Sequence, residues 1–212
     1  MKPNITKTIR VMIVDDHSMI RMGMAGLLAM ETDLQVVAEA EDLDQAVAAF
    51  SKHRPDVTLM DVRMPGGTGL EALKCIKSID SNARVMILST YDLEEPMIAA
   101  HSLGACGYLL KSVKFDELVA SIRCVHRGEK CFPSALQNHI AARAQRKPLT
   151  PREIEILYLL RRGFSNKDIG QVLEIAENTA KFHVKSILSK LEVTDRAEAV
   201  AAAFERGLLQ VD

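Results

Sequence analysis

Short apolar runs alternate with amphipathic segments over residues 9–127. Such runs are typical of strands buried on both faces of a parallel sheet, and the amphipathic segments between them predict crossover helices. We therefore expect an α/β domain with a doubly wound, five-stranded parallel sheet. Its strands are predicted at residues 9–14, 34–40, 57–60, 85–89 and 107–110, and its helices near 18–30, 43–52, 69–79, 94–102 and 115–127.

The pattern changes after residue 127. Gly128, Pro133 and a modest alanine-rich helical stretch lead to a basic end, so residues 128–147 are interpreted as a linker. Beyond them no strand pattern is found, and a capping residue is followed three positions later by an acid at three helix starts. These pairs are Thr150 with Glu153, Ser165 with Asp168 and Asp195 with Glu198. We expect one domain over residues 1–127 and a small all-α domain over residues 148–212.

Composition narrows the function classes only slightly. Of 212 residues, 48% are hydrophobic and 26% are charged, as in ordinary globular proteins. The formal net charge is −1, so a nucleic-acid surface has to be a local patch. No apolar run approaches the ~20 residues that span a bilayer, and no signal-peptide pattern is seen, so we expect a cytoplasmic protein with no membrane partner. The four cysteines lack metal-ligand spacing and are assigned no function.

Polar residues with related chemistry stand at the ends of four expected strands. Because ligands collect at the carboxyl ends of strands in an open parallel sheet, these side chains are expected to share one crevice. They are Asp15 and Asp16 after the first strand, Asp61 after the third, Ser89 and Thr90 at the fourth, and Lys111 after the fifth. Clustered carboxylates repel one another unless a hard cation offsets their charge, and Mg²⁺ prefers such oxygen ligands. The pattern predicts a magnesium site.

The same pocket suits phosphoryl transfer, which depends mainly on positioning and charge stabilisation. With Mg²⁺ and Lys111 supplying positive charge, Asp61 is the expected acceptor. Singly, each residue has an ordinary explanation, since aspartates are common at strand ends and lone lysines and serines are usually solvated or bonded to local backbone. Their joint occurrence at successive strand ends favours the functional interpretation.

The segment 178–191 carries one apolar stripe at helical spacing, and its other face is polar and basic. That face carries Asn178, Lys181, Phe182, Lys185 and Ser189. An ordinary solvated helix is the plain alternative. Phe182 argues against it, because an aromatic residue between lysines costs solubility unless it meets a partner such as a thymine methyl group. With the short helical segment that precedes it, this segment predicts a helix-turn-helix.

Residues 9–127 resemble the receiver domain of two-component signalling through VMIVDDH, LMDVRMPGGTGLE, VMILST and GYLLK. The resemblance implies a flavodoxin-like fold in which a sensor histidine kinase phosphorylates Asp61. It implies Mg²⁺ ligation by Asp15, Asp16, Asp61 and the Arg63 backbone carbonyl, and phosphoryl contact by Lys111. It also places Ser89 and Tyr108 in the switch-hydroxyl and switch-aromatic positions, with Arg63 and Thr90 as candidates for setting the lifetime of the phosphorylated state.

Some positions leave alternatives open or depart from the family. Taken without the resemblance, Tyr108 is better explained as a half-buried strand aromatic. Ser112 stands where related receivers often have proline, and Thr68 stands at a position that is often acidic. In the second domain, Gly170 interrupts a short helix at a cost of about 1 kcal/mol relative to alanine.

Residues 149–200 resemble the LuxR-type DNA-binding domain of the NarL/FixJ response regulators, over LTPREIEILYLLRRGFSNKDIGQVLEIAENTAKFHVKSILSKLEVTDRAEAV. The resemblance implies binding of promoter DNA as a homodimer. It places Lys181, Phe182 and Lys185 near base edges, and Thr179, Lys167, Ser165 and Arg196 near phosphates.

Together these features indicate a phosphorylation-controlled transcriptional regulator and not an enzyme. We expect phosphorylation to draw Ser89 toward the phosphoryl group and to let Tyr108 move inward, which shifts a conformational population. Two alternatives remain open: a constitutive DNA-binding regulator whose first domain serves only docking or dimerisation, and a metal-dependent phosphatase acting at the same sheet edge.

Overall fold

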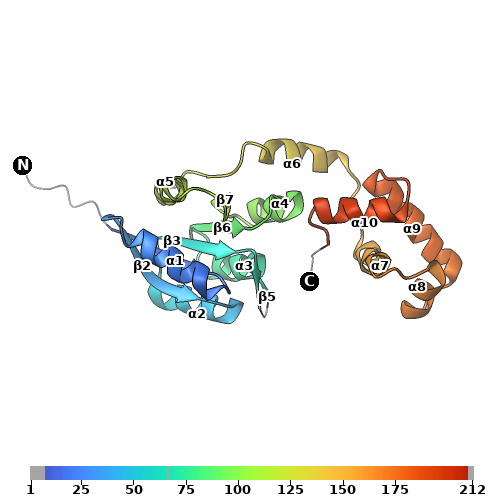
Figure 1. The fold of residues 1–212 in the computed structure, drawn as a ribbon, viewed down its shortest axis with the longest axis horizontal. Coiled ribbons are helices and arrows are strands. Elements are labelled where there is room, and N and C mark those ends of the chain that lie inside the picture. Colours follow the sequence, from blue (N-terminus) through green and yellow to red (C-terminus); the bar gives the residue numbers. More distant parts are fainter. Residues whose placement is uncertain (1–7, 66, 210–212) are drawn as a thin grey trace, which may run out of the picture. The chain divides into compact units, whose positions relative to one another are not determined.

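The computed structural model describes residues 8–65 and 67–209 (Figure 1). The chain divides into two compact units. Residues up to Asp92 together with Pro96–Leu136 form the first unit, and Leu93–Glu95 with the residues from Gln137 onward form the second. Each unit has its own hydrophobic core, as expected for separate domains.

The first unit is built on a five-stranded parallel sheet with the order β2-β1-β3-β6-β7. The predicted doubly wound α/β fold is therefore confirmed. The chain moves one way across the sheet after β1 and the other way after β2, which places the switch point between β1 and β3. The strands are β1 (Ile9–Val14), β2 (Leu34–Ala40), β3 (Val57–Asp61), β6 (Val85–Ser89) and β7 (Gly107–Leu110).

Five helices connect and cover these strands. Alternate residues of β1, including Val11 and Ile13, pack in one cluster with Leu28 and Ile122, so α1 and α5 cover the same face. Right-handed crossovers place the intervening helices on the opposite face. The helices are α1 (Ser18–Leu28), α2 (Leu43–His53), α3 (Gly69–Ile79), α4 (Glu94–Ser102) and α5 (Phe115–His126).

A small antiparallel hairpin after β3 was not predicted. Its strands are β4 (Arg63–Met64) and β5 (Gly67–Thr68), and they pair Arg63 with Thr68. Strands of two residues give no periodic signal, which explains the omission. The hairpin ends with Thr68, which is the N-terminal capping residue of α3. The Thr68 hydroxyl and the Glu71 carboxylate form a capping box there. That contact gives the unusual threonine a local structural role.

After α5 the chain returns to the edge of the sheet. Cys131 donates its backbone N–H to the Cys106 carbonyl at 2.8 Å and accepts a hydrogen bond from the Tyr108 N–H at 2.9 Å. These bonds form a parallel bridge between Cys131 and Gly107. Part of the segment that was interpreted as a linker is therefore held against β7. Backbone pairing of this kind has no side-chain pattern from which it could be predicted.

The second unit is all-helical, as predicted. Helix α6 (Leu136–Gln145) is followed along the chain by α7 (Pro151–Arg161), α8 (Asn166–Val172), α9 (Glu177–Leu191) and α10 (Arg196–Glu205). The capping boxes at Thr150 and Ser165 are confirmed. At α10 the Asp195 carboxylate caps the helix, and the Glu198 carboxylate accepts hydrogen bonds from the Thr194 N–H and hydroxyl at 2.8 Å. Among the described residues, no helix has the length and apolar character needed to cross a membrane.

A buried carboxylate lies at the centre of the second unit. Glu153 is only 3% exposed. Its oxygens accept hydrogen bonds at 2.7 Å from the Lys190 ammonium, the Ser186 hydroxyl and the Thr150 N–H. Burial alone would raise the pKa of Glu153, but these donors outweigh it and lower the pKa to about 2. Glu153 thus links the start of α7 to the last turns of α9.

Candidate functional site

The structure brings Asp15, Asp61 and Lys111 together at the carboxyl ends of β1, β3 and β7. Val14 pairs with Met60 in the sheet, so the aspartates that follow them stand side by side. The Lys111 Nζ lies 2.6 Å from Asp15 Oδ2 and 2.6 Å from Asp61 Oδ2. Three residues that are far apart in sequence therefore form one charged pocket at the switch point of the sheet.

Burial sets the electrostatics of this pocket. The Asp15 and Asp61 side chains are almost completely buried, and Lys111 is mostly buried. Burial raises the pKa of Asp61 above its ordinary value, against the opposing effect of Lys111. Burial disfavours the charged form of Lys111, but the two carboxylates outweigh it and raise the lysine pKa. The pocket thus holds two carboxylates with one cation between them.

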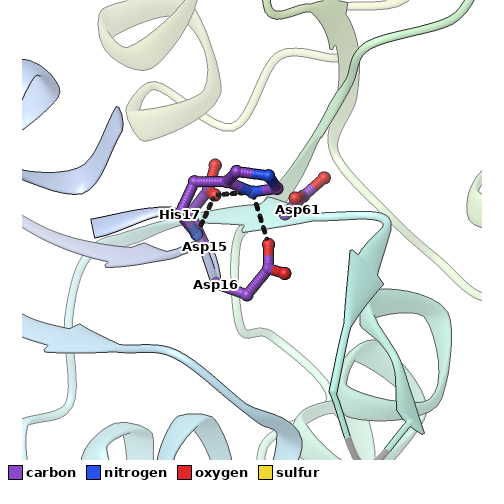
Figure 2. Close-up of side chains that lie close together, drawn as sticks. All are labelled: Asp15, Asp16, His17 and Asp61. Atoms are coloured by element: carbon purple, nitrogen blue, oxygen red, sulfur yellow. Dashed lines mark hydrogen bonds and ion pairs between the residues drawn. The ribbon is translucent and has the colours of Figure 1, made fainter. Parts of the chain in front are cut away.

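Asp16 lies at the mouth of the same pocket with His17 (Figure 2). The His17 Nδ1 is 2.7 Å from Asp16 Oδ1 and 3.4 Å from Asp15 Oδ1. The His17 backbone N–H also donates to Asp15 Oδ1 at 2.9 Å. One ligand atom from each of Asp15, Asp16, His17 and Asp61 lies within 4.8 Å of the others.

The donor set of the pocket fits a hard divalent cation. Asp15, Asp16 and Asp61 offer carboxylate oxygens, which are the ligands that Mg²⁺ prefers. Asp15 Oδ2 is buried and lies 2.6 Å from the Lys111 ammonium. A carboxylate has several lone-pair sites, so an oxygen that faces the ammonium can also accept a metal ion. Arg63, the fourth predicted ligand, begins β4 two residues after Asp61, and its backbone forms a hydrogen bond with the Asp61 carboxylate.

Gly69 explains how Asp61 is held in place. The Gly69 N–H donates to the Val62 carbonyl at 2.9 Å, at the start of α3. A Cβ atom at Gly69 would lie 1.8 Å from the Asp61 carbonyl oxygen, which is impossible without moving the backbone. Only glycine lets α3 begin this close to the end of β3.

The hydroxyl at the end of β6 does not contact Asp61 directly. Ser89 Oγ donates to the Tyr91 carbonyl at 2.7 Å and accepts from the Tyr91 N–H at 3.1 Å. Thr90 is exposed, and the Arg63 guanidinium lies 5.2 Å from the centre of the Tyr91 ring. Ser89 therefore holds the loop after β6 through both backbone polar groups of Tyr91.

Tyr108 is completely buried, and its hydroxyl lies 3.5 Å from the Tyr91 carbonyl. Tyr108 is therefore more deeply buried than the half-buried strand aromatic of the alternative. In this conformation the ring already lies inside. Burial raises the pKa of the Tyr108 hydroxyl above its ordinary value.

The second unit contains the predicted helix-turn-helix in α8 and α9. Ala180, Val184, Ile187 and Leu191 are buried in its core, so the opposite face of α9 lies at the surface. Phe182 is 72% exposed on that face. Lys181 and Lys185 are exposed beside it, and Lys181 pairs with Glu177 at 3.2 Å. This face of α9 thus carries an exposed aromatic ring between two cations.

The other predicted DNA contacts are distributed around these helices. Thr179 and Lys167 are exposed at the starts of α9 and α8. Ser165 Oγ donates to the Asp168 carboxylate at 2.6 Å, so its hydroxyl already serves the helix cap. Arg196 is exposed and donates to the Phe164 carbonyl at 3.4 Å.

Gly170 has a packing role that the sequence did not reveal. A Cβ atom there would lie 2.8 Å from the Ile175 carbonyl oxygen. The Gly170 carbonyl also accepts a hydrogen bond from the Ile175 N–H at 2.9 Å, within the turn before α9. The unfavourable helical glycine is therefore offset by a tight turn that sets the position of α9.

Two family profiles match the chain. The response regulator receiver domain matches residues 11–123, and the luxR family of bacterial regulatory proteins matches residues 147–203. The chain is 37% identical over 213 residues to the uncharacterized transcriptional regulatory protein YxjL of Bacillus subtilis, covering 95% of this chain and 98% of the relative. It is also 37% identical over 208 residues to the response regulator VraR of Staphylococcus aureus, covering 96% of this chain and 100% of the relative.

The chain also resembles solved structures of response regulators. RcsB from Salmonella enterica serovar Typhimurium, bound to the promoter P1flhDC with the phosphomimetic BeF₃⁻, is 25% identical with a TM-score of 0.70 and coverage of 95% of this chain and 100% of that chain. The response regulator ChrA of a heme-sensing two-component system is 35% identical, with a TM-score of 0.57. The match covers 95% of this chain and 99% of ChrA.

Proposed function

Because the chain belongs to the response regulators that join a receiver domain to a LuxR-type DNA-binding domain, we propose that phosphorylation of Asp61 controls its binding to promoter DNA. Residues 1–127 are assigned to the receiver, 128–147 to the linker and 148–212 to the DNA-binding domain. One observation carries the proposal: Lys111 Nζ lies 2.6 Å from carboxylate oxygens of both Asp15 and Asp61 at the switch point of the sheet.

The phosphodonor is a phosphohistidine of a sensor histidine kinase. An Asp61 carboxylate oxygen attacks the phosphorus, the phosphorus–nitrogen bond breaks, and the released imidazole takes a proton from solvent. The product is an acyl phosphate on Asp61. Lys111 offsets the charge of the phosphoryl oxygens, because its ammonium already reaches Asp61.

Asp15, Asp16, Asp61 and the Arg63 carbonyl hold Mg²⁺. When bound, Mg²⁺ offsets the charge that the phosphoryl group adds to an already acidic pocket. Asp15 fits this role because its carboxylate is buried beside that of Asp61, and the two share the Lys111 ammonium at 2.6 Å.

Ser89 is the switch residue. In the structure its hydroxyl is bonded to the Tyr91 backbone. A phosphoryl group on Asp61 offers Ser89 a stronger, charged acceptor, and the exchange releases the Tyr91 loop. Tyr108, which already lies inside, supports the released loop. Arg63 and Thr90, beside the reacting centre, influence how long the acyl phosphate survives.

Lys181, Phe182 and Lys185 on α9 approach base edges. Thr179, Lys167, Ser165 and Arg196 contact phosphates, which fixes position without reading sequence. We infer that a homodimer binds two half-sites, since a related structure is described as two RcsB dimers bound to two parallel DNAs.

Phosphate incorporation tests the first half of the proposal. The wild type, treated with acetyl phosphate and Mg²⁺, is expected to gain one phosphoryl group, and Asp61→Asn is expected to gain none. Asp44→Asn is the matched control, because Asp44 is an exposed carboxylate on α2. Equal incorporation in the wild type and Asp61→Asn would remove Asp61 from the mechanism.

DNA affinity tests the second half. Operator fragments are first selected with the full-length protein, and their affinity is then compared before and after acetyl phosphate treatment. We expect treatment to strengthen binding by the wild type but not by Asp61→Asn. Lys185→Gln is expected to weaken binding at any phosphorylation level by about 1 kcal/mol or more, whereas Lys52→Gln, at an exposed lysine on α2 of the first unit, is expected to leave it unchanged.

These experiments also address the alternatives. A constitutive regulator would bind DNA equally well with and without phosphate on Asp61. A phosphatase would turn over a generic phosphate ester, whereas the proposed regulator would not.

A further inference from the structure

His17 has no part in the proposed function, yet it stands at the mouth of the acidic pocket (Figure 2). Its side chain is 65% exposed, and its Nδ1 lies within 3.4 Å of oxygens from two proposed metal ligands, Asp15 and Asp16. His17 is the capping residue of α1, but its side chain makes no capping hydrogen bond. The ring is therefore directed by the carboxylates and not by the helix.

The spacing of these atoms is that of ligands around one ion. Ligands at about 2.1 Å from an ion in octahedral geometry are about 3.0 Å apart when adjacent and about 4.2 Å apart when opposite. The His17 Nδ1 lies 2.7 Å from Asp16 Oδ1 and 3.4 Å from Asp15 Oδ1. The largest separation in the set that includes Asp61 is no more than 4.8 Å. Rotation of the more exposed Asp16 and His17 side chains would bring them around a cation held by the buried Asp15 and Asp61 carboxylates.

We propose that His17 adds an imidazole nitrogen to the donor set, so that the pocket also binds divalent transition-metal ions such as Co²⁺, Ni²⁺ or Zn²⁺. Imidazole is a good ligand for these ions, whereas Mg²⁺ prefers oxygen. The inference rests on the proposed magnesium site, because three of the four donors are shared. It concerns which ions the site accepts, and not whether Asp61 is phosphorylated.

A simpler role for His17 makes a different prediction. If its Nδ1–H only donates to the Asp16 carboxylate, then His17 orients an oxygen ligand that all ions use. Removing the ring would then weaken the binding of Mg²⁺ and of transition metals by the same factor. If His17 ligates the ion directly, removing the ring weakens transition-metal binding selectively.

The test uses the full-length protein with Mg²⁺ and Co²⁺ as separate probes. Affinities are measured by isothermal titration calorimetry for the wild type, His17→Gln and His53→Gln. His53, at the end of α2, is the matched control for the loss of one imidazole. We expect the ratio of Co²⁺ to Mg²⁺ affinity to fall by about tenfold or more in His17→Gln only. The proton NMR spectrum of the Co²⁺ protein should contain a strongly shifted, exchangeable imidazole N–H signal that His17→Gln lacks.

The outcomes separate this inference from the proposed function. An unchanged affinity ratio in His17→Gln, or the same shifted signal in that variant, would overturn ligation by His17 and leave the magnesium site intact. Failure of the wild type to bind Mg²⁺ would instead contradict the proposed magnesium site.

Discussion

The buried Glu153 makes the stability of the second unit sensitive to acid. Its carboxylate is bonded to the Lys190 ammonium, the Ser186 hydroxyl and the Thr150 N–H, each at 2.7 Å. Replacing it by Gln keeps the size of the side chain but removes the charge that Lys190 faces. Lys190 is only 18% exposed, so water replaces the lost carboxylate poorly.

The magnitude follows from the pKa of Glu153. A lowering from 4.5 to about 2 corresponds to about 3 kcal/mol of stability at neutral pH. The folded state binds the proton less tightly than the unfolded state, so this stabilisation is complete above about pH 5 and is lost as the pH falls toward 2. About 1.4 kcal/mol of it should disappear between pH 7 and pH 3.5.

The assay is urea unfolding of the full-length protein followed by pulsed hydrogen exchange and mass spectrometry. Peptides from α7 and α9 report on the second unit alone. The stability difference between the wild type and Glu153→Gln should be about 3 kcal/mol at pH 7 and should shrink as the pH is lowered. Glu155→Gln is the matched control, because its exposed pair with Arg152 contributes about 0.5 kcal/mol or less. A Glu153→Gln difference that stays constant from pH 7 to pH 3.5 would refute the reasoning.

Two further predictions concern the first unit. Arg123 donates to both Asp33 oxygens, at 2.6 and 2.9 Å, and to Glu31 at 2.7 Å, so Arg123→Ala should cost about 1–2 kcal/mol in urea unfolding after allowance for its partial exposure. A loss of under about 0.3 kcal/mol would show that solvent compensates for these bonds. Gly69→Ala should abolish phosphorylation and cost about 3 kcal/mol or more, because its Cβ would meet the carbonyl of the acceptor aspartate. Gly23→Ala, whose Cβ meets nothing within 4 Å, should stabilise the same unit by up to about 1 kcal/mol, and an equal response of both glycines would contradict this account.

Elements with a periodic pattern were predictable from the sequence. Strands β1, β2, β6 and β7 have their predicted bounds. The strands β1, β6 and β7 are largely buried apolar runs that end at a polar residue, whereas β2 is buried only at Leu34 and Ala40. The strand ends in turn placed Asp15, Asp61 and Lys111 in one pocket, since parallel strands bring their carboxyl ends to one edge.

Features that depend on contacts between distant residues could not be predicted. The Thr150 and Glu153 pair was recognised only as a helix cap, because nothing in the sequence connects Glu153 to Lys190 across 37 positions. The tight turn after Gly170 and the position of the His17 ring also depend on how segments approach one another in space. In the sequence, Gly170 is recognised only as an unfavourable residue inside a helix. The structure shows that a side chain at this position would meet the Ile175 carbonyl oxygen.

The bridge between Cys131 and β7 determines where the first unit can be cut. An edge strand with unpaired N–H and C=O groups is a template for pairing with other chains. Cys131 occupies the backbone groups of Cys106 and Tyr108 on that edge. A truncation at residue 127 would expose them and favour self-association, so an isolated receiver should extend at least through Phe132, whose ring packs against His101.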